Sequence, residues 1–111
     1  MHIARGKMIH KRPSKDKSKI VITFAIPGSL WADRVHLVGD FNGWDRESLP
    51  LRQNGHEDWQ VELELEQGRK YRFRYLVDGD HWRNDRHADL HALGSDGNVD
   101  SVVIAQLSPE T

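Results

Sequence analysis

Two tryptophans stand in turn-rich stretches of the sequence, where a large aromatic ring is costly to expose unless it binds something. Trp44 ends the run GDFNGW at residues 39–44, and Trp82 comes just after the turn Asp78-Gly79. A flat indole covers the apolar C–H face of a pyranose ring, and polar neighbours take the sugar hydroxyls. Both residues are therefore candidates for stacking on a sugar, although the same rings would suit a peptide or a nucleobase.

Polar side chains close to these tryptophans in sequence complete a candidate binding platform. Arg74 lies on the polar face of the alternating stretch 70–77, and Asn98 and Asp100 open the last apolar stretch. Guanidinium, amide and carboxylate groups supply the donors and acceptors that hydroxyls need. Trp59 differs, because it lies on the apolar face of an alternating stretch and is expected in the core. The position of Trp31 in the sequence is compatible with burial in the core or with a place at the rim of the binding platform.

Catalysis is not expected. A glycosidase needs two carboxyl groups facing each other across a sugar-filled cleft, about 5 to 10 Å apart. The chain has 17 acidic residues, but no motif marks such a pair, and 111 residues leave little room for a deep cleft beside a core. We therefore predict no catalytic residues and no cofactor.

A metal site is an alternative that the sequence raises only weakly. His81, His87 and His91 cluster, with Asp85 and Asp89 between them. The spacing of His87 and His91 places two ligands on one face of a helix, but the surrounding residues do not support a helix. We expect a solvated, histidine-rich loop and no metal ion.

The composition bounds the remaining classes of function. The net charge of −1 argues against a whole-domain grip on nucleic acid, and no segment approaches the roughly 18 apolar residues of a membrane span. The absence of cysteine fits a cytoplasmic protein. Residues 1–17 are basic and lack the apolar core of a secretory signal. They are expected to form a flexible tail, and an anion-binding arm is the alternative.

The rest of the chain consists of strand and turn signals. Apolar or alternating stretches are separated by glycine, proline and Asp-Gly turns, and none has a helical period. We predict about seven short antiparallel strands forming an immunoglobulin-like β-sandwich over residues 18–106, with a short tail at 107–111 and a long polar loop at 84–97. The predicted strands are 19–26, 34–39, 49–52, 59–65, 70–77, 81–83 and 98–105.

Three blocks of the sequence resemble a known family in the order and spacing of their residues. VHLVGDFNGW at 35–44, a Y-x-F-x-Y-x-V-D-G block at 71–79 and NVDSVV at 98–103 are similar to the signatures of carbohydrate-binding module family 48, the glycogen-binding or isoamylase N-terminal type. The resemblance covers about residues 18–105. It implies an early-set immunoglobulin-like sandwich that binds α-1,4-glucan with α-1,6 branches and performs no chemistry itself.

The resemblance also assigns roles to residues. Trp44 and Trp82 match two stacking tryptophans, and Arg74 matches a family lysine that donates to sugar hydroxyls. Leu93 matches a leucine that contacts the glucan, and Asp100, with Asn98 beside it, falls near a family asparagine.

Relatives of this domain are attached to branching and debranching enzymes of glycoside hydrolase family 13 and occur in the beta subunit of AMP-activated protein kinase. The resemblance therefore implies a glycogen-metabolising enzyme or a kinase as a partner in trans. The alternative is a protein-interaction module that docks on such a partner without binding sugar.

Overall fold

The computed structural model describes residues 9–53, 55 and 57–107. Within these residues the chain forms nine β-strands and one short 3-10 helix, η1, so the predicted all-β class is confirmed. The elements are β1 (His10–Pro13), β2 (Lys19–Ile26), β3 (Val35–Gly39), η1 (Asp40–Asn42), β4 (Arg52–Gln53), β5 (Trp59–Glu66), β6 (Lys70–Val77), β7 (His81–Arg83), β8 (Leu90–Leu93) and β9 (Val99–Ile104).

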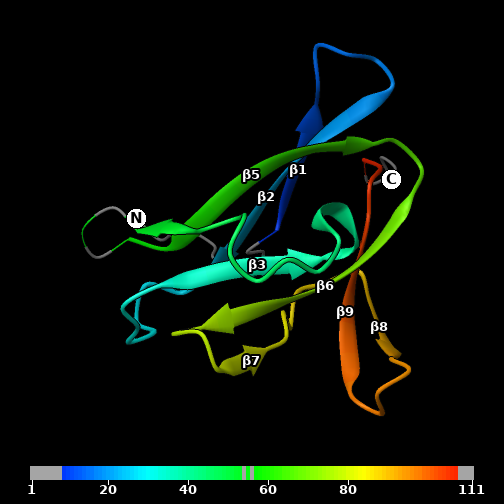
Figure 1. The fold of residues 1–111 in the computed structure, drawn as a ribbon. Helices are drawn as coiled ribbons and strands as arrows, with labels where there is room; N and C mark the ends of the chain where they lie inside the picture. The colour runs from blue at the N-terminus through cyan, green and yellow to red at the C-terminus, as the bar shows by residue number, and fades with distance from the viewer. Residues whose placement is uncertain (1–8, 54, 56, 108–111) are drawn as a thin grey trace.

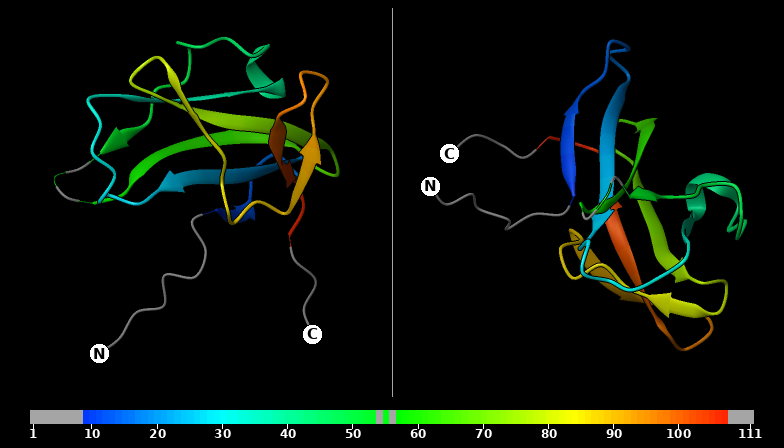
Figure 2. Two further views of the ribbon diagram at one scale, coloured as in Figure 1. Left: turned by 90° about the horizontal axis from the view of Figure 1, so that it is seen from below. Right: turned by 90° about the vertical axis from the view of Figure 1, so that its left-hand side faces the viewer.

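The strands form two antiparallel sheets. Sheet A has the order β1-β2-β5-β4, and sheet B has the order β3-β6-β9-β8, with β7 also paired to β6 (Figure 1). Strand β6 is the centre of sheet B because it pairs with β3 along one side and with β7 and β9 along the other. In the left view of Figure 2 the β2–β5 pair lies beneath the β3–β6 pair. This two-layer arrangement confirms the immunoglobulin-like sandwich.

Alternating side chains build the core between the sheets. In β5, Trp59 and Leu65 are buried while Gln60, Glu62 and Glu64 are exposed, which confirms the predicted pattern and the core position of Trp59. From the other sheet, Phe73 and Tyr75 of β6 have no exposed surface. Phe73 packs edge-on against Phe24 of β2 and also against Tyr75. Burying one such side chain stabilises the fold by roughly 1.5–3 kcal/mol.

The turn between β6 and β7 has the backbone that its sequence predicts. Asp78 and Gly79 have φ angles of 53° and 81°, and a type I′ turn requires positive φ at both central residues. The Asp78 carboxylate also accepts the backbone N–H groups of Asp33 and Arg34, at 2.8 and 3.1 Å. These two bonds, that of Arg34 first, hold the pKa of Asp78 below its usual value.

Two strands lie where loops or tails were predicted. Strand β1 falls inside the expected flexible tail 1–17, so that expectation is wrong for residues 10–13. The sequence of β1, HKRP, shows no alternation of apolar and polar residues. The strand is held by backbone pairing with β2, by the buried side chain of the preceding Ile9, and by an ion pair of Lys11 with Asp89 at 2.8 Å. Strand β8 falls inside the expected loop 84–97, so that expectation is wrong for residues 90–93; it pairs with β9 at the edge of sheet B. The remaining tail residues 1–8 and 108–111 lie outside the described residues.

Among the residues that the structure describes, no helix is long and apolar enough to cross a membrane.

Candidate functional site

A hollow of about 600 Å³ opens on the outer face of sheet B. Phe73 and Tyr75 point into the core, so the alternation of β6 turns Arg72 and Arg74 to the opposite face. We call this the tryptophan hollow. Its lining includes five of the six predicted site residues, Trp44, Arg74, Trp82, Leu93 and Asp100, together with Asp40, Arg46, Arg72, Gly94, Ser95 and Asp96.

Trp44 is held at the rim of the hollow by its own backbone and by Asp40. It follows η1 with a φ angle of 61°, in the left-handed region that bulky side chains rarely adopt. The indole N–H donates to Asp40 Oδ1 at 2.9 Å, and Asp40 Oδ2 accepts the backbone N–H of Arg72 at 2.8 Å. The indole is therefore fixed to β6 through one carboxylate. Backbone strain of this kind persists where the surrounding structure enforces it, and it is concentrated at functional sites.

The other residues of the GDFNGW run anchor the turn. Phe41 packs on Phe24, with ring centroids 5.5 Å apart, and so joins the aromatic core. The Asn42 side chain accepts the N–H of Gly39 at 3.0 Å and donates to the carbonyl oxygen of Asp45 at 3.0 Å. A Cβ on Gly39 would overlap the Arg72 carbonyl oxygen, so only glycine lets the turn approach β6 so closely.

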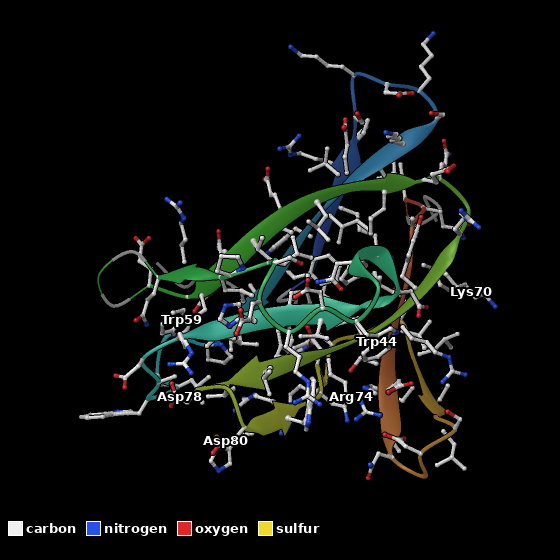
Figure 3. The ribbon with its side chains drawn as sticks, in the orientation of Figure 1. Trp44, Trp59, Lys70, Arg74, Asp78 and Asp80 are labelled. Atoms are coloured by element: carbon white, nitrogen blue, oxygen red, sulfur yellow. The ribbon has the colours of Figure 1, made fainter. Side chains whose placement is uncertain are left out.

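Trp82 lies on β7, and its indole is approached by two guanidinium groups. The Arg46 guanidinium is 5.3 Å from the ring centroid and that of Arg74 is 5.9 Å away. Arg74 is also 5.9 Å from the Trp44 ring, so one guanidinium lies close to both indoles. Figure 3 shows Trp44 and Arg74 near each other and away from Trp59 and Asp78. Trp82 remains 41% exposed, which leaves much of its surface open to a ligand.

Arg74 is buried beneath the hollow and is fixed by carboxylates. Its Nε donates to Asp100 Oδ1 at 2.6 Å, and Asp100 Oδ2 accepts from Arg72 at 3.1 Å. The Asp100 side chain is only 7% exposed. Each oxygen of Asp100 therefore accepts from an arginine, and the carboxylate supports Arg74 in this structure. Sequence reasoning placed Asp100 in the site but assigned it to the sugar.

The β8–β9 turn supplies the opposite rim. Leu93, 70% exposed, ends β8 at the hollow. Asn98 does not line the hollow; its backbone N–H and side-chain amide donate to Asp96 at 3.0 and 3.3 Å. These bonds, the backbone one first, and the Arg74 guanidinium lower the pKa of Asp96 below its usual range. Asp96 was not predicted; the Asp96-Gly97 pair signals only a turn, and its contact with Arg74 spans 22 positions.

The remaining tryptophan and the histidines lie apart from the hollow. Trp31, which the sequence left open, is 95% exposed and does not line it. The histidine spacing does not fall on a helix, since His87 is in a turn and His91 is in β8, where its Nε2 is 2.8 Å from the Asp85 carbonyl oxygen. Among the described residues, no group of three or more His, Cys, Asp or Glu side chains is placed to hold a metal ion.

Comparison with known proteins agrees with the family that the three sequence blocks resemble. The family described as the glycogen recognition site of AMP-activated protein kinase matches residues 20–108. The chain is also similar to the 1,4-alpha-glucan branching enzyme GlgB 2 from two strains of Xanthomonas campestris pv. campestris, 8004 and ATCC 33913. Each is 38% identical over 57 residues, which is 48% of this chain and 8% of the branching enzyme. With a match that spans most of its two sheets, the chain belongs to the family of glycogen recognition domains.

Proposed function

We propose that this domain binds α-glucan in the tryptophan hollow and catalyses no reaction itself. One observation carries the proposal beyond family membership: the Arg74 guanidinium lies 5.9 Å from the ring centroids of both Trp44 and Trp82. Two indoles and a fixed cation thus converge at one opening. Its volume of about 600 Å³ falls within the range of roughly 300–1,000 Å³ that is usual for small-molecule sites.

The chemistry of glucose matches the lining of the hollow. The apolar C–H faces of successive glucose units would lie against the Trp44 and Trp82 indoles, and the exposed Leu93 side chain adds apolar surface at the other rim. Arg74 would donate to hydroxyl oxygens from a position fixed by Asp100, so little ordering of the protein is needed on binding. Such shallow contacts exchange water for protein with modest net gain, so we expect weak affinity per glucose unit.

A role in targeting follows from the same proposal. The branching enzymes to which this chain is similar act on 1,4-alpha-glucan according to their name, and the matched family is named for a kinase. A domain that binds glucan without cutting it would bring an attached or associated enzyme, or a kinase, to glycogen. When the purified domain and its partner enzyme or kinase are mixed with glycogen and centrifuged, the partner should appear in the glycogen pellet. A partner that stays in the supernatant would contradict targeting.

The first test is binding of glycogen and maltoheptaose, measured by affinity electrophoresis and by tryptophan fluorescence, with cello-oligosaccharides as the non-binding ligand. Saturable retardation and a fluorescence change with α-glucan alone are expected. Trp44→Ala and Trp82→Ala should each weaken binding by about tenfold or more, which corresponds to about 1.4 kcal/mol. Both variants should remain folded, because neither side chain belongs to the buried core cluster.

Trp31→Ala is the matched control. It also removes an exposed indole, but from a loop outside the hollow. Binding should be unchanged in this variant. If Trp31→Ala abolishes binding while the Trp44 and Trp82 variants retain it, the site lies elsewhere on the domain. If the unmodified domain shows no response to millimolar α-glucan, the proposal is wrong and docking on a protein partner becomes the better explanation.

A further inference from the structure

Strand β8 is an edge of sheet B that lacks the usual protection against further pairing (Figure 1). Proteins guard such edges with charged side chains, proline, short length or a covering segment. Strand β1 (HKRP) is charged and ends in proline, β4 and β7 have two and three residues, and residues 49–51 cover β3 through two backbone bonds of 2.8 Å. Strand β8 (LHAL) contains no Asp, Glu, Lys, Arg or Pro, and among the described residues it pairs with β9 alone. Its outer edge is therefore open to another strand.

The ladder with β9 decides which backbone groups of β8 face outward. In an antiparallel pair, opposed residues alternate between those that bond each other and those that do not. The Gly94 N–H donates to the Asn98 carbonyl oxygen at 2.7 Å, so these two residues are a bonded pair. Counting back along β8, Ala92 and Leu90 are also bonded to β9, and His91 between them is not. The N–H and C=O of His91 therefore point to the free edge, as a donor beside an acceptor.

The side chains of β8 divide between the two faces of sheet B. Ala92 is opposite Asp100, which lines the tryptophan hollow, and opposed residues of a pair share a face. Leu90 is two residues from Ala92, so it lies on the same outer face, where it is 46% exposed. His91 is opposite Ser101, which is fully buried, so the histidine side chain turns inward. The outer surface of β8 thus presents a large apolar side chain beside a small one.

We propose that two copies of this domain pair through β8, antiparallel, about a two-fold axis that passes beside His91. The outward N–H and C=O of His91 then bond the same groups of the second copy, so the edge complements itself. On the outer face, Leu90 of each copy lies opposite Ala92 of the other, a large side chain against a small one. Because LHAL carries no acidic or basic residue other than histidine, the two copies meet without charge repulsion. A two-fold contact of this kind closes on itself and forms no fibre.

The dimer is weak in solution but gains strength on a polymer. A pair of four-residue strands buries much less than the ~1,200 Å² of a standard stable interface, so we expect a dissociation constant of about 0.1–1 mM. Pairing about this axis continues sheet B, so both hollows open on the same face. The β9 strands of the two copies are three strand spacings apart, roughly 14 Å. This consequence rests on the proposed function: a glucan chain that reaches both hollows is held more tightly, through effective concentration.

Sedimentation equilibrium at protein concentrations up to about 1 mM tests the pairing without any sugar. The unmodified domain should form a dimer as its concentration rises. His91→Pro removes the outward N–H but leaves the ladder with β9 intact, and edge strands tolerate proline, so the dimer should weaken at least about tenfold. His91→Ala is the matched control, because it also loses the histidine side chain but keeps the N–H. Its dimer should be within about twofold of the unmodified one.

Ala92→Lys is a second variant that stands even where proline disturbs the strand. It keeps the ladder bond to β9 and places a charge opposite Leu90 of the other copy, so it should also weaken the dimer. Gln60→Lys, on the exposed face of β5 in sheet A, should not. The inference is wrong if the unmodified domain stays monomeric throughout, which would leave the edge to a strand of a partner enzyme. It is also wrong if His91→Pro and Ala92→Lys dimerise as the unmodified domain does.

Glycogen binding separates this inference from the proposed function. His91→Pro should bind glycogen about three- to tenfold more weakly than His91→Ala, because it loses the second hollow. Both variants should bind maltotriose equally, since this sugar is too short to reach two hollows. Equal glycogen binding by the two variants would refute the bivalent role. A domain that dimerises through β8 but binds no α-glucan would contradict the proposed function and leave the dimer standing.

Discussion

Replacing Asp100 by alanine breaks the ion pair that holds Arg74 beneath the tryptophan hollow. The two side chains are 7% and 11% exposed, and their atoms are 2.6 Å apart, so the pair is buried and short. Removing one partner of a buried pair leaves an uncompensated charge and usually costs about 3–5 kcal/mol. Asp96 still lies 3.3 Å from Arg74, so we expect the lower end of this range, about 3 kcal/mol.

A double-mutant cycle isolates the pair itself. The free energy of unfolding is measured in urea for Asp100→Ala, Arg74→Ala and the double variant, with circular dichroism as the signal. The double variant removes both charges, so it should be more stable than the sum of the single effects predicts, with a coupling energy of about 2 kcal/mol. Arg72→Ala serves as the control, because Arg72 is 41% exposed and its ion pair with Asp100 should contribute less than about 1 kcal/mol.

A coupling energy below about 0.5 kcal/mol would refute the reasoning, because Asp100 would then have no special dependence on Arg74. The same variants link stability to function. Asp100→Ala should weaken glucan binding through misplacement of Arg74, because Asp100 accepts the Nε–H of that residue at 2.6 Å. Normal binding by a folded Asp100→Ala domain would show that Arg74 needs no such support.

Three further outcomes are expected. Trp59→Ala should lower the free energy of unfolding by about 3–5 kcal/mol in urea titration, since this tryptophan is 7% exposed in the core; an effect under about 1 kcal/mol would contradict the packing. Trp44→Gly and Trp44→Ala should lose glucan binding alike, but glycine should be more stable by about 1 kcal/mol because φ is 61°, and equal stability would argue against backbone strain. Burial and the nearby Asp85 charge raise the pKa of Tyr75 well above 10.0, so folding binds its proton more tightly. Stability should hold below pH 10.0 and fall as the pH rises above it, and Tyr75→Phe should flatten that fall; an identical alkaline decline in both proteins would contradict this assignment.

Much of the fold was readable from local patterns. The alternation of residues 59–65 placed Trp59 and Leu65 in the core, because successive strand side chains point to opposite faces. The Asp78-Gly79 pair predicted a tight turn through the backbone angles it tolerates. Strands β1 and β8 were not predicted from the sequence. Each is an edge strand held by backbone hydrogen bonds, which residues of any type can form, and HKRP in β1 shows no alternation of apolar residues.

The candidate site divides in the same way. The two tryptophans near turns, Trp44 and Trp82, and Arg74 on the polar face of an alternating stretch were visible in the sequence. The resemblance of the surrounding blocks to a glycogen-binding family pointed to α-glucan. The sequence by itself determined the alternating strands, the turn residues and the family signature, because these depend on near neighbours in the chain.

Only the tertiary structure decided what each polar group faces. It turned Asp100 toward two arginines, tied Asn98 to its own turn and brought Asp96 to Arg74 from 22 positions away. Such contacts depend on how β6, the η1 turn and the β8–β9 turn pack together, and no local pattern records the distance between elements that meet only after folding.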